Sequence, residues 1–131
     1  MLKISAVQDK SLQREYCELV KISYDADLMC YAAYDDGEFV GISLFSLKNK
    51  SCIIHKIQLL PNKKDYLATY LLAKAPMNFA DLCGFKNAVF EDDDIKLAKE
   101  LEFTETDGVY SVSLEGYFTT PCQKNGCKAD E

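Results

Sequence analysis

A short segment with two lysines is the first place in this sequence where chemistry could occur. Residues 59–72, LLPNKKDYLATYLL, run from an apolar segment through a proline into an amphipathic helix, with Lys63 and Lys64 just before the helix. A helix N-terminus presents unpaired N–H groups and the positive end of the helix dipole, which favour an anion. The segment therefore predicts either a phosphate site or a solvated helix cap with two lysines. It contains no glycine, the residue that lets backbone N–H groups approach a phosphate closely.

The single histidine, His55, is a further candidate. It lies in an apolar segment with the character of a strand, in phase with Ile53, Ile57 and Leu59, because alternate residues of a strand share a face. A histidine in this position is either a catalytic base or a hydrogen-bonded residue of the core. The sequence leaves both interpretations open.

Acidic and thiol groups form two further clusters. The run Glu91–Asp94 could suggest a metal site, but carboxylates at a helix N-terminus complement the dipole and cap free N–H groups, so we expect no metal. Cys122 and Cys127 lie in a polar segment, PCQKNGC. They are either ordinary thiols or a disulfide or metal site shared between chains, and this spacing without histidine is a weak metal signal. The other four cysteines (Cys17, Cys30, Cys52 and Cys83) lie in apolar runs and are expected to be reduced and buried.

Composition limits the classes of function. The 131 residues fit one domain, which we place at residues 1–116, followed by a polar tail at 117–131. A formal charge of -6 argues against sequence-independent binding of nucleic acid, which needs a dense basic surface. No apolar run is long enough to span a membrane and the N-terminus has no signal-peptide core, so a cytoplasmic protein without membrane partners is expected.

The elements that must position these residues follow from periodicity and turn signals. Strands are expected at 2–7, 28–35, 38–47, 52–59, 86–90, 103–106 and 109–116, with Asp36-Gly37 and Asp107-Gly108 as hairpin turns. Helices are expected after Asp9, from about 65 to 83, and within 91–101. Pro76 lies inside the second helix, where it predicts a kink or two abutting helices. The order strand 52–59, helix, strand 86–90 predicts a parallel, right-handed crossover.

This order of elements resembles the GNAT family of acyl-CoA-dependent N-acetyltransferases. YAAYDDGEFVGISLF resembles the hairpin of the family's second and third strands, and IQLLPNKKDYLATYLL resembles its fourth strand, cofactor loop and helix. LAKELEFTETDGVYSVSL resembles the end of the family's domain, so the likeness covers roughly residues 1 to 115. The resemblance implies a mixed α/β fold: a predominantly antiparallel sheet of six to seven strands, one parallel crossover, and helices on both faces.

The resemblance also implies acetyl-CoA as cosubstrate and places its binding on the segment after the fourth strand. The residues concerned are Leu59, Leu60, Asn62, Lys63, Lys64, Asp65, Tyr66, Leu67 and Ala68. By the same resemblance, the backbone N–H of Leu59 or Leu60 polarises the acyl carbonyl group. The loop departs from the family's glycine-rich pattern, because Lys64 and Tyr66 lie near glycine positions. A bulky residue held at positive φ would cost roughly 1–2 kcal/mol there.

For the acyl chemistry, the resemblance implies a base and an acid. His55 is the candidate base. Ala98 stands where family members commonly have a tyrosine acid, so Tyr110 or Tyr117 would have to replace it. The acceptor is an unidentified amine, either a small molecule or a peptide, and a homodimer remains open. Two alternatives remain: a non-catalytic module of the same fold that has lost its cofactor loop, and a dimeric protein that binds another apolar or acyl ligand.

Overall fold

The computed structural model describes residues 1–118, and Cys122 and Cys127 lie outside the described residues. The chain forms one seven-stranded sheet in the order β1-β2-β3-β4-β5-β7-β6. All neighbouring strands are antiparallel except β4 and β5. The elements are β1 (Leu2–Val7), α1 (Lys10–Val20), β2 (Met29–Asp35), β3 (Glu38–Lys48), β4 (Ser51–Leu59), α2 (Tyr66–Leu82), β5 (Asn87–Phe90), α3 (Ile95–Glu100), β6 (Thr104–Thr106) and β7 (Val109–Ser113). The fold class expected from the sequence is confirmed.

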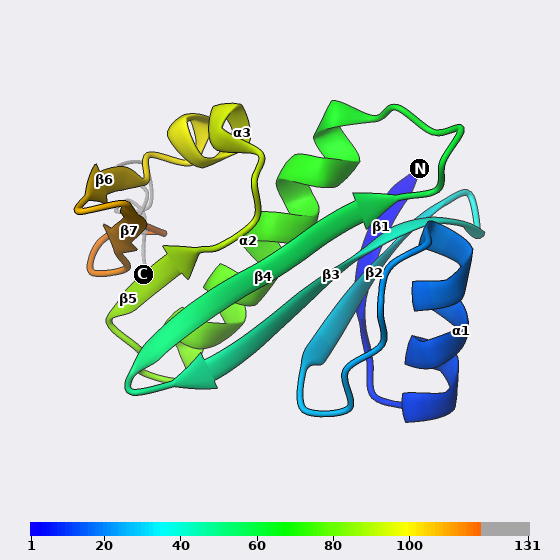
Figure 1. Ribbon diagram of the computed structural model, residues 1–131, viewed down its shortest axis with the longest axis horizontal. Helices are drawn as coiled ribbons and strands as arrows, with labels where there is room; N and C mark the ends of the chain where they lie inside the picture. Colours follow the sequence, from blue (N-terminus) through cyan, green and yellow to red (C-terminus); the bar gives the residue numbers. More distant parts are fainter. Residues whose placement is uncertain (119–131) are drawn as a thin grey trace.

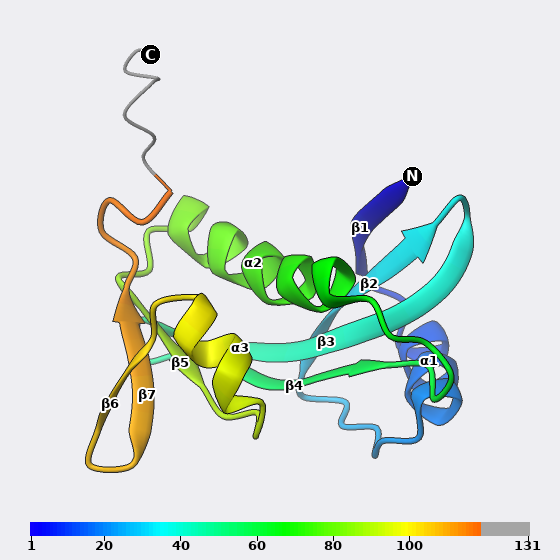
Figure 2. The same cartoon turned by 90° about the horizontal axis from the view of Figure 1, so that it is seen from above.

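Helices lie on both faces of the sheet. Figures 1 and 2 show α1 on one face and α2 with α3 on the other. In the view of Figure 1, α1 lies beside β2 and β3, and β4 and β5 have no helix in front of them. β3 is buried on both sides along most of its length, as its continuous apolar sequence predicts.

Both predicted hairpin turns form. Asp36 and Gly37 have φ values of 50° and 85°, and Asp107 and Gly108 have 53° and 83°. Two successive residues at positive φ match the twist of the flanking strands, and Asp-Gly adopts this conformation at low cost. These turns fix the register of β2 with β3 and of β6 with β7.

The second helix is a single element in spite of its proline. α2 runs continuously from Tyr66 to Leu82 with Pro76 buried inside it, so two abutting helices do not form. The side chain of Asp65 caps its first turn by accepting from the N–H of Ala68. After its last turn, Gly84 adopts φ 87°, the left-handed conformation common just beyond a helix end.

The pairing of β4 with β5 is parallel, as the crossover predicts, and the two strands separate after Ile54. They pair from Ser51 opposite Asn87 to Ile54 opposite Phe90, and the last backbone bond joins the N–H of Glu91 to the C=O of Ile54. Beyond this point β4 continues to Leu59, whereas β5 has ended. The result is a gap beside β4 that no strand of the described chain fills.

A bulge in β4 changes which residues face the core. Leu44 pairs with Lys56 and the next residue, Phe45, pairs with Ile54, so His55 is the extra residue. Before the bulge, Cys52 and Ile54 face the α2 side; after it, Ile57 and Leu59 do. The predicted common phase of His55 with Ile57 and Leu59 is therefore wrong, because the bulge reverses the alternation.

The cysteines follow the prediction with one exception. Cys17, Cys30 and Cys52 are free and buried, and burial raises the pKa of the Cys30 and Cys52 thiols to about 12. Cys83 is free but exposed, because it caps the end of α2. Within residues 1–118, no helix has the length and apolarity needed to cross a membrane, and no group of three metal-ligating side chains occurs.

Candidate functional site

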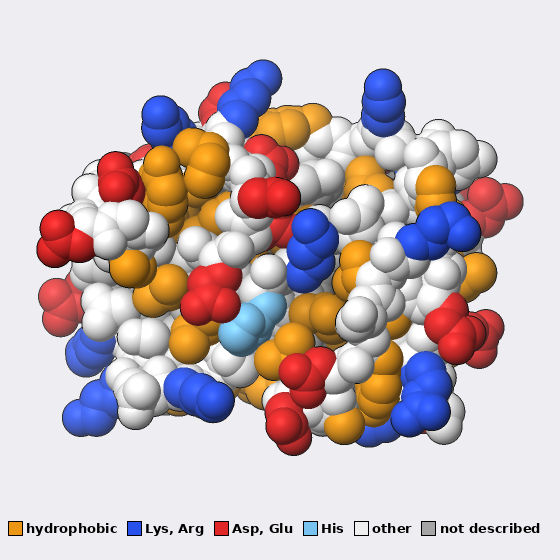
Figure 3. Space-filling view, in the orientation of Figure 1, with side chains coloured by type: hydrophobic (Ala, Val, Ile, Leu, Met, Phe, Trp, Pro, Cys, Tyr) orange, Lys and Arg blue, Asp and Glu red, His pale blue; other side chains and the backbone are white. Residues whose placement is uncertain are grey.

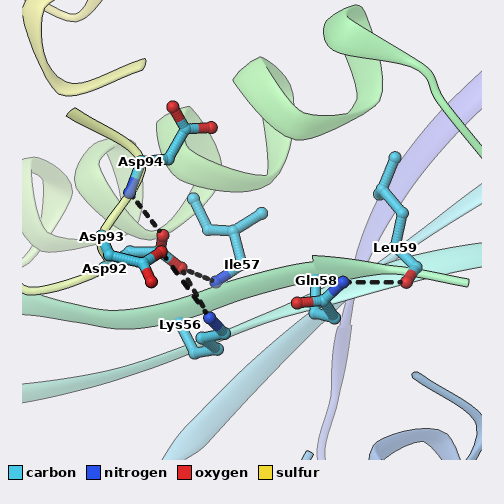
Figure 4. A network of polar contacts seen from close by, with 7 residues as sticks. All are labelled: Lys56, Ile57, Gln58, Leu59, Asp92, Asp93 and Asp94. Atoms are coloured by element: carbon cyan, nitrogen blue, oxygen red, sulfur yellow. Dashed lines mark hydrogen bonds and ion pairs between the residues drawn. The ribbon is translucent and has the colours of Figure 1, made fainter. Parts of the chain in front are cut away.

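A polar hollow of about 430 Å³ lies where β4 and β5 separate. Its walls come from the end of β4, the loop that follows, the first turn of α2 and the segment before α3 (Figure 4). The lining residues are Lys56, Ile57, Gln58, Leu59, Leu60, Pro61, Lys63, Thr69, Asp92, Asp93 and Asp94. Two lysines and three aspartates thus face the same space.

Asp92 bridges the gap between the diverging strands. Its Oδ2 accepts from the N–H of Ile57 at 2.8 Å, and its Oδ1 accepts from the N–H of Asp94 at 2.9 Å (Figure 4). Its side chain is only 4% exposed. Burial raises the pKa of the Asp92 carboxyl above its usual 3.8, although the two N–H groups and Lys56 act in the opposite direction.

The other acidic residues of this run have different roles. Asp94 caps α3 by accepting from the N–H of Leu97, which confirms the capping prediction for this residue. The Nζ of Lys56 lies 3.9 Å from both Asp92 and Asp93. The bridge made by Asp92 was not predicted, because it depends on a strand distant in the sequence.

Backbone groups along β4 divide between its two edges. The N–H of Leu60 donates to the C=O of Val40 in β3, so it is engaged within the sheet and is not available to polarise a ligand. Because successive residues of a strand direct their N–H groups to opposite edges, the N–H of Leu59 points the same way as that of Ile57, into the gap. Both residues line the hollow, but of the two predicted N–H donors only that of Leu59 is directed into the gap.

The predicted cofactor loop is unstrained. Within residues 61–68 no residue has a positive φ, so the absence of glycine costs nothing in backbone strain here. Lys63 lines the hollow, and its N–H closes a turn onto the C=O of Leu60. Asn62 and Lys64 are exposed, and neither lines the hollow.

The first turn of α2 contributes less to the hollow than the sequence suggested. The carboxylate of Asp65 accepts a hydrogen bond from the N–H of Ala68, and the side chain of Ala68 is fully buried. Leu67 is exposed, and the ring of Tyr66 lies tilted against Tyr70 at a centroid distance of 6.3 Å. The Tyr66 ring therefore lies along the helix and does not line the hollow. Thr69, which was not predicted, does line it.

His55 lies at the base of the gap, on the face of the sheet opposite α2. Its Nε2 is 2.8 Å from the Oγ of Ser46, and its Nδ1 is 3.1 Å from the Oε1 of Glu91. The pale-blue side chain at the surface in Figure 3 is this histidine, the only one in the chain. Both ring nitrogens thus have partners, and the ring is partly exposed at 29%.

The two candidate acids lie in different environments. Tyr110 pairs with Phe90 across β5 and β7 and lines a neighbouring hollow together with Glu91 and Asp92. The hydroxyl of Tyr117 donates to the C=O of Leu101 at 2.9 Å. Burial raises the pKa of Tyr117 to about 12, so its proton is held firmly at neutral pH.

The sequence reasoning did not identify five residues of the site: Ser46, Lys56, Thr69, Glu91 and Asp92. One signal was available for the two acids: they follow directly after a strand whose parallel neighbour contains His55. The carboxyl ends of parallel strands meet at one edge of a sheet, where ligands commonly bind. Ser46 had no such signal, because its contact with His55 depends on the bulge.

Solved structures of N-acetyltransferases are similar to this chain over most of their length. The spermidine N-acetyltransferase of Vibrio cholerae, in a mutant form, aligns with a TM-score of 0.70 at 11% identity over 90% of this chain and 96% of its own. The ribosomal-protein-S18-alanine N-acetyltransferase of Escherichia coli aligns with a TM-score of 0.68 at 12% identity over 87% and 94%. The PaiA N-acetyltransferase of Thermoplasma acidophilum, solved in complex with coenzyme A, aligns with a TM-score of 0.61 at 10% identity over 86% and 99%.

These similarities establish the fold of the chain as the GNAT fold. No protein-family model matches the sequence, and no curated protein matches it. At 9–12% identity the likeness concerns the fold alone, so the activity has to be argued from the residues of this chain.

Proposed function

We propose that this chain, which has the GNAT fold, is an acyl-CoA-dependent N-acyltransferase that moves an acetyl group to an amine. The observation that carries the proposal is the hollow between the diverging strands, which has Lys56 and Lys63 in its walls and the start of α2 beside it. An acidic protein can still bind an anion beside a lysine. Three aspartates share this hollow, and two of them lie 3.9 Å from the Nζ of Lys56. A protein of the same fold, the PaiA N-acetyltransferase of Thermoplasma acidophilum, was solved in complex with coenzyme A, which supports the choice of this ligand.

In this proposal the phosphates of acetyl-CoA lie near Lys63 and Lys56, and the acyl carbonyl lies at the open edge of β4. The N–H of Leu59 then stabilises the negative charge that develops on the carbonyl oxygen. Tyr110, on β7 beside β5, is the remaining candidate to protonate the departing thiolate, since the hydroxyl of Tyr117 is bound to Leu101.

The attacking amine must lose a proton, and His55 is the group beside the gap that can accept it. Glu91 holds the Nδ1 of the ring, so the Nε2 lone pair faces the hydroxyl of Ser46. A proton from the amine would reach the ring through this hydroxyl: Ser46 passes its own proton to Nε2 and takes the proton of the amine. The amine can approach from the α1 side of the sheet, because α1 ends at Val20 and β2 begins at Met29 without a further helix between them.

A non-catalytic binding protein of the same fold is the alternative, and one observation favours it. The Asp92 carboxylate already holds the N–H of Ile57 at the edge of β4 where an extended ligand would pair. Acetyl-CoA would have to displace this contact or pass beside it.

The test is binding followed by turnover. Acetyl-CoA at a hundred times its Kd should stabilise the fold by about 2.7 kcal/mol, which is measurable in a thermal scan. S-acetylpantetheine lacks the nucleotide phosphates and should bind more weakly if the lysines contact them. Release of free thiol that depends on the added primary amine, together with detection of the acetylated amine by mass spectrometry, would establish transfer. A thermal scan and calorimetry without response to millimolar acetyl-CoA would reject the proposal, and binding without turnover would favour the alternative.

A further inference from the structure

Three side chains on adjacent strands form a hydrogen-bonded chain on the α1 side of the sheet, where β4 and β5 have no helix in front of them (Figure 1). Ser46 belongs to β3, His55 to β4, and Glu91 follows β5 directly. The Oγ of Ser46 lies 2.8 Å from Nε2 of His55, and Oε1 of Glu91 lies 3.1 Å from Nδ1 of the same ring. Each contact joins residues of neighbouring strands.

The alternation of the strands brings these side chains to one face. On β3, Ile42 and Leu44 pack on the α1 side, so Ser46 points the same way. On β5, Ala88 and Phe90 pack on the α2 side, so Glu91 points away from it. The bulge at His55 places the ring between them. Bulges commonly re-aim a side chain next to an active site.

The order of the contacts matters chemically. A carboxylate on Nδ1 fixes the tautomer in which Nδ1 carries the proton, so Nε2 can accept the proton of the serine hydroxyl. Nucleophile, base and orienting acid have this arrangement in serine hydrolases of unrelated folds, which are recognised by geometry and not by sequence position. We propose that Ser46 is a nucleophile that accepts an acyl group from a small activated ester or thioester and releases it to water.

The reaction balances with water as the only co-reactant. The Oγ of Ser46 bonds to the acyl carbon while its proton moves to Nε2 of His55. The bond from the acyl carbon to the alcohol or thiol breaks, and the leaving group takes the proton from Nε2. Water then attacks the same carbon, gives a proton to Nε2, and the ester bond to Ser46 breaks as Oγ recovers that proton. The products are a carboxylic acid and an alcohol or thiol.

Exposure indicates which acyl groups can react. Ser46 is only 7% exposed, whereas the side chains of His55 and Glu91 are 29% and 53% exposed. The nucleophile therefore lies deeper than its base, and a short, unbranched acyl group such as acetyl fits this position better than a bulky one.

The experiment uses the full chain without coenzyme A, so its outcome does not depend on the proposed transferase activity. The protein is mixed with p-nitrophenyl acetate, release of p-nitrophenolate is followed, and the acetyl adduct is mapped by mass spectrometry. We expect an adduct on Ser46. A general base typically contributes about 10²–10⁴-fold, so Ser46→Ala and His55→Asn should each lower the rate of release by at least about 100-fold. Glu91→Gln should shift the pH profile of the reaction, because it no longer holds a negative charge beside the ring.

Two variants serve as controls. Ser111→Ala changes a serine of β7 that pairs with Val89 on the same face of the sheet, and it should leave the rate unchanged. Ser46→Cys keeps a nucleophile of similar size and should still form an adduct, which separates loss of chemistry from loss of fold. An adduct on His55 in place of Ser46, or a Ser46→Ala variant that reacts at the rate of the unaltered chain, would overturn the proposal.

Discussion

Individual residues around the gap between β4 and β5 differ in what they contact, and these contacts separate neighbours that look equivalent in the sequence. Lys63 lines the hollow and Lys64 does not. The N–H of Leu59 faces the gap, whereas that of Leu60 is bound within the sheet. Asp92 is buried and bridges two segments, and Asp93 beside it is almost fully exposed.

The two lysines give a matched pair of variants. Lys63→Ala should weaken acetyl-CoA binding by up to about fivefold, since an ion pair at an exposed site contributes up to roughly 1 kcal/mol. Lys64→Ala should have a smaller effect. Calorimetric titration at two salt concentrations measures both, and the loss caused by Lys63→Ala should shrink as salt rises. Equal losses from the two variants would mean that the ligand does not lie in the hollow.

Asp92 should make stability depend on pH. Its pKa is raised in the folded state, so the folded chain binds more protons than the unfolded chain just above pH 3.8. The contribution of Asp92 to the free energy of unfolding is therefore fully present below pH 3.8 and is lost as pH rises through the folded pKa.

Asp92→Asn removes this titration. In urea unfolding, the free energy of unfolding of the unaltered chain minus that of the variant should fall from pH 4 towards neutral pH. If this difference in the free energy of unfolding stays constant or rises with pH, the N–H groups of Ile57 and Asp94 stabilise the charged carboxylate.

At the scale of elements, the closeness of β3 and β4 depends on one glycine. A Cβ at Gly41 would lie 2.5 Å from Cδ2 of Leu59, 2.7 Å from the C=O oxygen of Gln58 and 2.8 Å from Cα of Leu59. Two of these atoms belong to the backbone of β4, so they cannot move aside alone. Gly41 thus allows the close approach of the two strands beside the gap.

Gly41→Ala should lower the free energy of unfolding by about 1–3 kcal/mol and shift the amide resonance of Leu59. Gly37→Ala serves as the comparison, because its Cβ would meet open space and only its φ of 85° causes strain. That variant should also be destabilised but should leave the resonance of Leu59 unchanged. If both variants shift the amide resonance of Leu59 equally, the contact of the new Cβ at position 41 with β4 is not the cause of the shift.

The cap of α2 is a second element-scale feature. Asp65→Ala should cost about 1 kcal/mol, within the usual range of roughly 0.5–2 for a lost N-cap, because the N–H of Ala68 loses its acceptor. Asp65→Asn keeps a side-chain oxygen and should restore most of the stability. Thermal unfolding measures the stability of both variants. An equal loss of stability in the two would mean that the charge of Asp65, and not its hydrogen bond to Ala68, stabilises the helix.

At the scale of the whole molecule, stability should be uneven across the sheet. β3 lies between two apolar clusters and is buried on both faces, whereas β6 is a three-residue strand exposed along its length. Regions with few buried contacts open at lower free energy than the core. Native-state hydrogen exchange should therefore show amides of β6 opening well below the global free energy of unfolding and amides of β3 close to it. Equal protection of the two strands would contradict this expectation.

Much of the fold could be predicted from the sequence, because its signals are local. Asp36-Gly37 and Asp107-Gly108 determine hairpins through the conformations their own backbones adopt, and Asp9, Asp65 and Asp94 cap helices within a few residues of themselves. The crossover between β4 and β5 followed from the order of strand, helix and strand. The position of Lys63 at the end of the fourth strand also followed from this order.

The contacts of the site were decided by the tertiary structure alone. One inserted residue in β4 turns His55 to the face opposite Ile57 and places it between Ser46 and Glu91, and the sequence carries no mark of the bulge. Asp92 reaches Ile57 across 35 residues only because β5 ends where β4 continues. Periodicity reports which residues alternate along one strand. Which strand diverges, and which side chain then fills the gap, depends on packing between segments distant in the chain.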